Sequence, residues 1–399
     1  MRSSHLRPVH AIALASMCLW LTSCVGAQPS ASRGPAAGTS TMLTWAPPFT
    51  TGGHVGRATA LLQARGFQAI AAHPWTYRDD LAPMRRVRSG LTVFAYLNGT
   101  FAQSVQGRTY PASWYLRDAS GRRVRSREWG NYLMNPANPG WIADRVARCR
   151  RFLRISHDDG CMVDMLGTAP LYGWYVTGAP IDPSTGRPWS AAGWLAATAQ
   201  LGAAIRAGSG GAPVIANGLG DGRRFFDERA PSERLLDGID GAVADGWLRT
   251  AERPADRYPS VRAWTRDVEM LASTDKSVFV ETKVWTHATP EQIAAWHRFA
   301  VASFLLGSDG HAYFAFSDDA RGPAVPDALA ASVRIGDPVG TFRASDGVFV
   351  RSFSNGIVVV NPTPQAASTD LGADYRTDDG AVVRSVTVNP HSGLILTTP

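Results

Sequence analysis

The chain has 399 residues, of which 45% are hydrophobic and 18% are charged, and its formal net charge is +7. This composition provides enough apolar material for one large buried core and a smaller second domain. The basic residues are scattered and do not form a long stripe interleaved with aromatic residues, so we expect no nucleic-acid partner.

The N-terminus has the pattern of an export signal. Arg2 and Arg7 precede an apolar stretch at residues 11–21, which is too short to span a bilayer. The stretch ends in Leu-Thr-Ser-Cys, and this motif resembles the site at which a bacterial lipoprotein is cleaved and lipidated on its cysteine. We therefore expect residues 1–23 to be a lipoprotein signal peptide and Cys24 to carry a lipid that anchors the exported protein to a membrane of the cell envelope.

An ordinary secretory signal cut near Ala27 is the alternative, and it would leave the protein extracellular. Residues 24–40 are small and rich in Pro, Gly and Ser, so they are predicted to be a flexible tether. No later run reaches the ~20 apolar residues that a membrane-spanning helix needs.

Eight short apolar runs alternate with helix-like stretches beyond the tether. The runs lie at residues 42–45, 69–72, 92–98, 161–165, 213–217, 241–247, 277–283 and 311–316. Most are apolar on both faces, which is typical of parallel strands covered by helices. The alternation predicts an α/β fold, a (β/α)8 or TIM barrel over residues 41–333, with a doubly wound open sheet as the alternative.

The intervening stretches carry helical signals of different strength. The clearest signal for the start of a helix is at Thr289, a predicted N-cap residue. Pro follows it directly, and Gln lies three residues after it. The first helix is predicted to bury an apolar stripe made of Val55, Ala58, Leu61 and Leu62.

The sequence pattern changes after about residue 333, where β-type runs replace the alternation of strands and helices. Four β-type runs lie at residues 347–353, 356–361, 382–388 and 393–397, separated by short segments rich in Gly, Asp, Asn and Pro. This pattern predicts a small antiparallel β domain over residues 334–399.

Two cysteines remain in the expected mature chain beyond the lipidation site. Cys149 lies on a predicted helix and Cys161 on the strand that follows it. In an oxidising compartment a bridge between them is feasible, and two buried thiols are the alternative.

Three of the apolar runs carry a carboxylate within two residues of their C-terminal end: Asp164, Asp245 and Glu281. The C-terminal strand ends of a barrel line one shared pocket, so these acids can meet around one substrate bond. Glycoside hydrolysis needs one carboxylic acid to protonate the leaving oxygen and one carboxylate to attack the anomeric carbon or to activate water. We assign Asp164 as nucleophile or base and Asp245 as general acid. Glu281 is a supporting acid or the alternative partner, because Lys283 on the same strand face can pair with it.

Two long connections, residues 99–139 and 166–189, follow the third and fourth strands and would stand over this pocket. They are rich in aromatic residues, and the apolar faces of sugars stack on such rings. Asn side chains near strand ends can bond the sugar hydroxyls. The predicted substrate-binding residues are Trp45, Asn98, Trp114, Trp129, Trp174, Asn217, Trp247 and Trp285. The alternative is that the rings fill small cores of the loops themselves.

Other chemistries have little support in the sequence. The chain has no His-Glu-x-x-His, Cys-x-x-Cys, Walker-type or Gly-x-Ser-x-Gly motif, and we expect neither a metal nor a cofactor. A surface lipoprotein that binds glycan without cutting it is the second hypothesis. A barrel lyase or isomerase, which would use a base without a second acid, is the third.

Several motifs together carry a family resemblance. They lie at residues 94–99, 114–121, 132–141 and 159–165, and the last of them ends in the Asp164 strand. In this order they resemble the bacterial hypothetical glycosyl hydrolase family fifteen, and the likeness covers most of residues 42–399. The segments 356–362 and 390–396 also resemble the β domain that closes many barrel glycosidases.

The resemblance implies a TIM barrel acting on polysaccharide, with Asp164 matching the acid of the fourth strand and Asp245 that of the sixth. We therefore predict an exported, monomeric glycoside hydrolase that cleaves the O-glycosidic bonds of a polysaccharide or oligosaccharide.

Overall fold

The computed structural model describes residues 42–48, 53–102, 109–220, 235–251, 253–318 and 324–399. The expected signal peptide, Cys24 and the tether lie outside these residues. None of the helices in the described part of the chain is long and apolar enough to cross a membrane.

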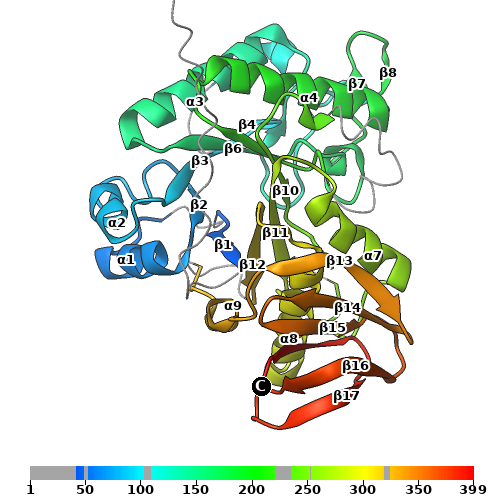
Figure 1. Ribbon diagram of the computed structural model, residues 1–399. Coiled ribbons are helices and arrows are strands. Elements are labelled where there is room, and N and C mark those ends of the chain that lie inside the picture. Colours follow the sequence, from blue (N-terminus) through cyan, green and yellow to red (C-terminus); the bar gives the residue numbers. More distant parts are fainter. Residues whose placement is uncertain (1–41, 49–52, 103–108, 221–234, 252, 319–323) are drawn as a thin grey trace, which may run out of the picture. The chain divides into compact units, whose positions relative to one another are not determined.

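Eight parallel strands close into a barrel (Figure 1). In chain order they are β1 (Leu43–Ala46), β2 (Ala69–Ala72), β3 (Thr92–Asn98), β6 (Gly160–Asp164), β9 (Val214–Asn217), β10 (Gly241–Ala244), β11 (Ser277–Lys283) and β12 (Ala312–Ser317). Each strand pairs with the next one in this order, and β12 pairs with β1. The predicted (β/α)8 barrel is confirmed, and its closure excludes the open doubly wound sheet.

Helices and short loop strands connect the barrel strands. The helices are α1 (Arg57–Gly66), α2 (Leu81–Val87), α3 (Pro139–Ser156), α4 (Ala191–Gly208), α7 (Val261–Glu269), α8 (Pro290–Gly307) and α9 (Ala328–Ser332). The two long loops carry the paired strands β4 (Phe101–Ala102) with β5 (Tyr132–Leu133) and β7 (Ile181–Asp182) with β8 (Arg187–Pro188). Short 3-10 turns lie at Ala112–Trp114, Ala169–Leu171 and Met270–Ala272.

Local sequence signals explain several helix starts. Thr289 forms a full capping box with Gln292 at the start of α8, as the sequence predicted. The first helix differs from its prediction, because Ala58 and Leu62 are exposed. Helix α1 instead buries the polar Gln63, whose Oε1 accepts a 2.6 Å hydrogen bond from the hydroxyl of Tyr77. Because this buried amide is hydrogen-bonded, the helix can turn it inward in place of Leu62.

The barrel interior fixes which side chains reach the pocket. Its buried cluster contains Trp45, Ala69, Ala71, Phe94, Met162, Ile215, Val243, Phe279 and Ala315. Side chains two positions apart on a strand share a face, so the next inward position lies nearer the C-terminal end of the barrel. The polar residues at this level are Asp164 after Met162, Asn217 after Ile215, Asp245 after Val243 and Glu281 after Phe279.

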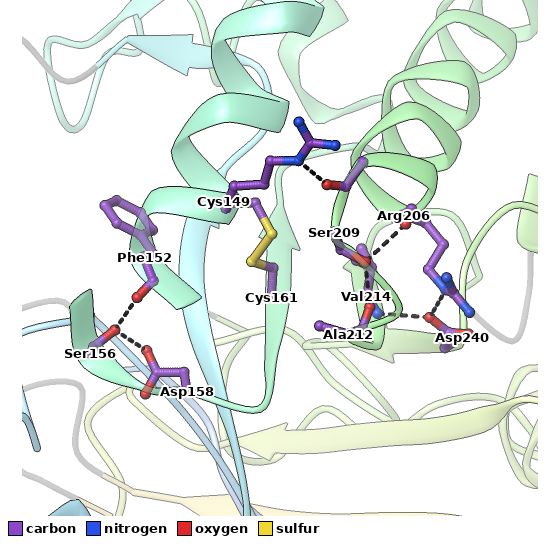
Figure 2. The surroundings of a disulfide bond; sticks show 12 residues. Cys149, Phe152, Ser156, Asp158, Cys161, Arg206, Ser209, Ala212, Val214 and Asp240 are labelled. Atoms are coloured by element: carbon purple, nitrogen blue, oxygen red, sulfur yellow. Dashed lines mark hydrogen bonds and ion pairs between the residues drawn. A yellow bond between two sulfur atoms is a disulfide. The ribbon is translucent and has the colours of Figure 1, made fainter. Parts of the chain in front are cut away.

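A disulfide joins helix α3 to the strand that follows it. Cys149 and Cys161 are bonded, with their Cα atoms 6.2 Å apart (Figure 2). Both residues are fully buried in the main core. The bridge therefore ties α3 to β6, the strand that ends in Asp164.

The C-terminal residues form a six-stranded antiparallel sheet, drawn in orange and red in Figure 1. Its strands are β13 (Pro338–Ser345), β14 (Val348–Phe353), β15 (Gly356–Asn361), β16 (Ala367–Arg376), β17 (Val382–Val388) and β18 (Ser392–Thr397). The predicted β domain is confirmed, with β13 and β16 added to the four predicted runs. These two strands are mostly exposed and polar, so they lack the apolar pattern that revealed the others.

The sheet and the barrel share buried contacts around α8. Arg351 of β14 is 6% exposed and donates hydrogen bonds to the carbonyl oxygens of Leu305, Leu306 and Ser308 at 2.6–3.1 Å. These carbonyls belong to the C-terminal turn of α8, where backbone acceptors lack helical partners and a cation is favourable. Gly393 of β18 lies so close to α8 that a Cβ there would be 2.3 Å from Ala302.

Candidate active site

One pocket of about 270 Å³ opens among the C-terminal ends of the barrel strands. Its lining residues are Trp45, Pro47, Pro48, His73, Tyr96, Asn98, Phe101, Ser126, Glu128, Trp129, Asn131, Met162, Asp164, Met165, Tyr175, Asn217, Asp245, Glu281, Lys283 and Trp285. The three carboxylates that the sequence singled out are therefore brought together around one cavity.

Asp164, the last residue of β6, is hydrogen-bonded to both neighbouring strands of the barrel. Its Oδ2 accepts a 2.7 Å hydrogen bond from the hydroxyl of Tyr96 on β3, and its Oδ1 accepts a 2.8 Å bond from the amide of Asn217 on β9. The backbone N–H of Met165 donates a third bond to Oδ1 at 2.7 Å. Met165 has a φ of +64°, so the strand ends there in a left-handed turn. Three donors on two oxygens are complementary to an ionised carboxylate.

The electrostatics of Asp164 are set by burial and by a neighbouring acid. Burial raises the pKa of Asp164 above its ordinary value, and the negative charge of Asp245 adds to the increase, while the three hydrogen bonds oppose it. The two carboxylates therefore lie close enough to interact. Burial and the charge of Asp164 also hold the pKa of Tyr96 well above its usual range, so this hydroxyl stays protonated and keeps donating.

Lys283 connects the other two acids. Its Nζ lies 3.1 Å from Oδ2 of Asp245 and 3.5 Å from Oε2 of Glu281. Burial alone would lower the pKa of Lys283, but the charges of Asp245 and Glu281 raise it above its ordinary value, so the ammonium persists. The Glu281–Lys283 pair that the sequence indicated is present, with Asp245 as an added partner.

Glu281 is also held from its other side. Its Oε1 accepts a 2.8 Å hydrogen bond from the hydroxyl of Ser317, whose oxygen in turn accepts a 2.8 Å bond from Nε1 of Trp285. Glu281 is 3% exposed. Both of its oxygens are therefore engaged below the surface of the pocket.

The side chains of the two predicted asparagines form hydrogen bonds with neighbouring protein groups. Oδ1 of Asn98 accepts from the backbone N–H of Phe101 at 2.8 Å and from that of Thr100 at 3.2 Å, which turns the chain into the long loop after β3. Asn217 gives its amide to Asp164. Both line the pocket, and contact with a sugar hydroxyl stays a prediction for each.

Three of the predicted tryptophans line the pocket. Trp45 is 1% exposed and donates to the carbonyl oxygen of Val280 at 2.9 Å, so its ring is a fixed wall. Trp285 lies under the ammonium of Lys283, 4.6 Å from the ring centroid. Trp129 is 48% exposed and belongs to the loop after β3. These rings offer both an enclosed and an open apolar surface to a ligand.

The other three predicted tryptophans do not line this pocket. Trp247 is 2% exposed and donates to the carbonyl oxygen of Asp267 at 2.7 Å, because β10 ends at Ala244 and the chain then turns into the core. Trp114 packs on α3, where a Cβ on Gly140 would meet its ring at 2.3 Å. Trp174 is 71% exposed and lies parallel to Tyr172 with a centroid separation of 6.4 Å. Trp114 and Trp247 therefore pack against the main core, and not into a small core of the loops.

Sequence reasoning missed several groups around the acids. Tyr96, Glu128 and Tyr175 line the pocket, and Ser317 donates a hydrogen bond to Glu281. Strand periodicity could have found Tyr96, which lies two residues before Asn98 and faces the barrel interior. Glu128 and Tyr175 come from the long loops, and no periodic signal predicts where a loop side chain points. Tyr175 lines the pocket together with Asp164, Glu128 and Asp245. Burial raises the pKa of Tyr175, and the charges of these acids add to the increase.

In the described ranges, no cluster of three or more His, Cys, Asp or Glu side chains has the arrangement of a metal site.

The sequence model of a family described as hypothetical glycosyl hydrolase family 15 matches residues 96–357. This confirms the resemblance that the motifs indicated. No curated protein matches the chain.

Solved structures of similar fold include several amylases. A noncanonic maltogenic alpha-amylase from Thermotoga neapolitana is 11% identical with a TM-score of 0.55, and the match covers 90% of this chain and 98% of that one. An Eubacterium rectale protein named Amy13B is 10% identical with a TM-score of 0.51, covering 91% and 97% of the two chains. An alpha-amylase from Geobacillus thermoleovorans is 12% identical with a TM-score of 0.50, covering 90% and 98%. At such identities the likeness concerns the fold alone.

Proposed function

The chain belongs to hypothetical glycosyl hydrolase family 15 and is a glycoside hydrolase, and from that premise we propose that it cleaves the O-glycosidic bonds of a polysaccharide with Asp164 and Asp245. The observation that carries this proposal is that both carboxylates line one pocket at the C-terminal ends of neighbouring parts of the barrel. Glycoside hydrolysis needs such a pair on either side of the scissile bond.

Asp164 has the surroundings of the nucleophile or base. Its three hydrogen-bond donors stabilise the ionised form, while burial keeps its pKa above the ordinary value. A carboxylate of raised pKa is a better base than one in water. In the reaction, Asp164 attacks the anomeric carbon or takes a proton from the water that attacks it.

Asp245 is the general acid of the proposal. Its side chain is 49% exposed, so it can reach a glycosidic oxygen. Asp245 acts in its protonated form: as the bond between the anomeric carbon and this oxygen breaks, the oxygen takes that proton and the leaving sugar departs as an alcohol. Glu281 is too deeply buried to make this contact and serves as a supporting group.

Export with a lipid anchor on Cys24 is also part of the proposal. The bond between Cys149 and Cys161 supports it, because disulfides persist in oxidising compartments outside the cytosol. The test is metabolic labelling of the expressed chain with an alkyne analogue of palmitate. We expect label in the wild-type chain and none in Cys24→Ser, whereas equal labelling of both would disprove the anchor.

The catalytic assignment is tested on a panel of defined polysaccharides: starch, a mixed-linkage β-glucan, xylan, pectin and chitosan. Reducing ends measure cleavage, and the anomer of the first product, read by NMR, tells whether Asp164 attacks carbon or activates water. We expect Asp164→Asn and Asp245→Asn to lose at least about 1000-fold in kcat on the substrate that is cleaved. Asp256→Asn, an exposed acid on the loop that follows Asp245, is the matched control and keeps full activity. Undiminished hydrolysis by a folded Asp164→Asn protein would overturn the assignment.

A further inference from the structure

Lys283 is the cation at the centre of the acidic pocket. Its side chain is 12% exposed and its Nζ is bracketed by Asp245, Glu281 and the ring of Trp285. A buried ammonium is costly unless it is paired, and here two carboxylates and an aromatic face compensate it. Its position is therefore defined by three contacts and not by one flexible ion pair.

The two carboxylates on either side of Lys283 differ in how firmly they are held. The side chain of Glu281 is 4% exposed and accepts a hydrogen bond from Ser317, and Trp285 in turn donates to the Ser317 hydroxyl. The side chain of Asp245 is 49% exposed and follows the last residue of β10. An acid so placed can adopt several rotamers unless a neighbour holds it. Of the two carboxylates that contact Lys283, the side chain of Glu281 is therefore fixed, and that of Asp245 can change its rotamer.

The choice of lysine at this position is informative. Lys276 and Lys283 are the two lysines of a chain with 40 Lys and Arg residues, so all the others are arginines. An ammonium is a compact charge that fits between two carboxylates and an indole ring, whereas a planar guanidinium needs more room and a different geometry. The site uses the residue type that the chain otherwise avoids.

We propose that Lys283, anchored by Glu281 and seated on Trp285, is a positioning residue that holds the carboxyl group of Asp245 in place beside Asp164. The proposal rests on the glycosidase function proposed above and deepens it, because it gives Glu281 a role other than that of a catalytic acid. The ammonium fixes Oδ2 of Asp245 and leaves Oδ1 to face the leaving oxygen. As the proton of Asp245 passes to that oxygen, the ammonium stabilises the carboxylate that forms.

Several other titratable groups face the same cavity. They are Glu128 and Tyr175 from the long loops, His73 after β2, and Tyr96 and Asp164 from the barrel strands. Among these pocket residues Lys283 carries the fixed positive charge, so its removal leaves the acids to repel one another. Every nearby carboxyl group then becomes easier to protonate.

The kinetic test compares Lys283→Met with Lys283→Arg on the polysaccharide that the wild-type protein cleaves. We expect Lys283→Met to lower kcat about 100-fold with less than about a threefold change in KM, because the ammonium acts on Asp245 and not on the sugar. Both limbs of its pH–rate profile should move to higher pH. Lys283→Arg should recover about tenfold and restore the wild-type profile, because it returns the charge with imperfect geometry. Lys276→Met, which removes the other lysine, is the control.

A purely structural ion pair would give a different pattern. Lys283→Met would then lower the melting temperature while kcat and the pH profile stayed those of the wild-type protein. That result would overturn the proposal.

A second readout needs no substrate and keeps this inference separate from the proposed function. Acetic anhydride at pH 8 acetylates uncharged amines, and mass spectrometry can compare Lys283 with Lys276 as the internal reference in one sample. We expect Lys283 to react at least about tenfold more slowly than Lys276 in the wild-type protein, and markedly faster in Asp245→Asn and in Glu281→Gln. Should Glu281→Gln fail to fold, Ser317→Ala replaces it, because it loosens the same anchor. An unchanged rate for Lys283 in these variants would disprove the bridge, even if no polysaccharide is cleaved.

Discussion

Strand β6 carries an aspartate at each end, and the two ends of the barrel use them differently. Asp159 precedes the strand, where its Oδ2 accepts from the backbone N–H of Val93 at 2.8 Å and its Oδ1 accepts from Arg85 at 2.7 Å. Asp164 ends the strand, where it accepts three hydrogen bonds but faces a pocket. The same residue type therefore ties neighbouring strands together at one end and offers a reactive group at the other.

A second acid at the N-terminal end follows the same rule. Asp240 precedes β10 and its Oδ2 accepts from the backbone N–H of Val214 at 2.8 Å and pairs with Arg206 (Figure 2). Each of these acids joins its own strand to the start of the preceding one. In a (β/α)8 barrel, stability is concentrated at this end and chemistry at the other.

The largest effect should come from exchanging the carboxylate at the pocket end. Asp164→Asn should lower kcat by about 1000-fold or more while its melting temperature stays at or above that of the wild-type protein. The amide oxygen still accepts from Met165 and Asn217, and the hydroxyl of Tyr96 can reverse its bond. Paired kinetics and thermal melts check this, and a strongly destabilised variant would show that the two ends of β6 are alike.

Asp159→Ala should have the opposite signature. It leaves the buried N–H of Val93 without its acceptor and removes the pair with Arg85, so the free energy of unfolding should fall by about 1–3 kcal/mol. The kcat and KM values should match those of the wild-type protein. Urea titration measures the first quantity. A large loss of kcat in the folded variant would contradict the division between the two ends.

Tyr96→Phe should produce a smaller and more selective effect. Without this hydroxyl, one of the hydrogen bonds that lower the pKa of Asp164 is lost, so this pKa rises further. The acidic limb of kcat/KM should move to higher pH, and activity at acidic pH should fall about tenfold with less change at neutral pH. Tyr77→Phe, a buried tyrosine bonded to Gln63, is the control. Identical profiles for both variants would count against Asp164 as the base.

The smallest effect concerns Asp158, beside Asp159 at the N-terminal end. Burial raises the pKa of this carboxyl from 3.8 to about 7, and the charge of Asp159 adds to the shift. A carboxyl whose folded pKa exceeds its unfolded pKa destabilises the fold when it is ionised. The cost is absent below about pH 4, grows as the pH rises to 7, and is constant above it. Asp158→Asn should therefore add about 1–2 kcal/mol of stability at pH 8 and almost none at pH 4. Melts at the two pH values measure the difference, and equal effects at both would refute this account.

Much of the fold follows from local patterns. Strands such as Ala69–Ala72, Thr92–Asn98 and Ser277–Lys283 were placed at their observed bounds, because a parallel barrel requires short runs that are apolar on both faces. The end of the sixth strand was placed too late, at Trp247, because the apolar residues beyond Ala244 belong to the core outside the barrel. Strands β13 and β16 were not predicted, because a mostly exposed strand lacks the apolar residues by which a strand is recognised in a sequence.

The candidate site was predicted in part for the same reason. Residues at strand ends, such as Asp164, Asn217 and Glu281, could be placed, because strand periodicity and barrel closure determine where they point. Residues on the long loops could not. Trp129 reaches the pocket, whereas Trp174 lies outside it, and nothing in their local sequence separates the two.

The sequence by itself determined the barrel, its C-terminal sheet and the acids at the strand ends, because these depend on periodicities of a few residues. Only the tertiary structure decided what each acid touches. Lys283 lies two residues from Glu281 in the chain, but its bond to Asp245 spans two strands and 38 positions. Charge interactions of this kind depend on distances of a few ångströms between residues far apart in sequence, and those distances exist only once the barrel has closed.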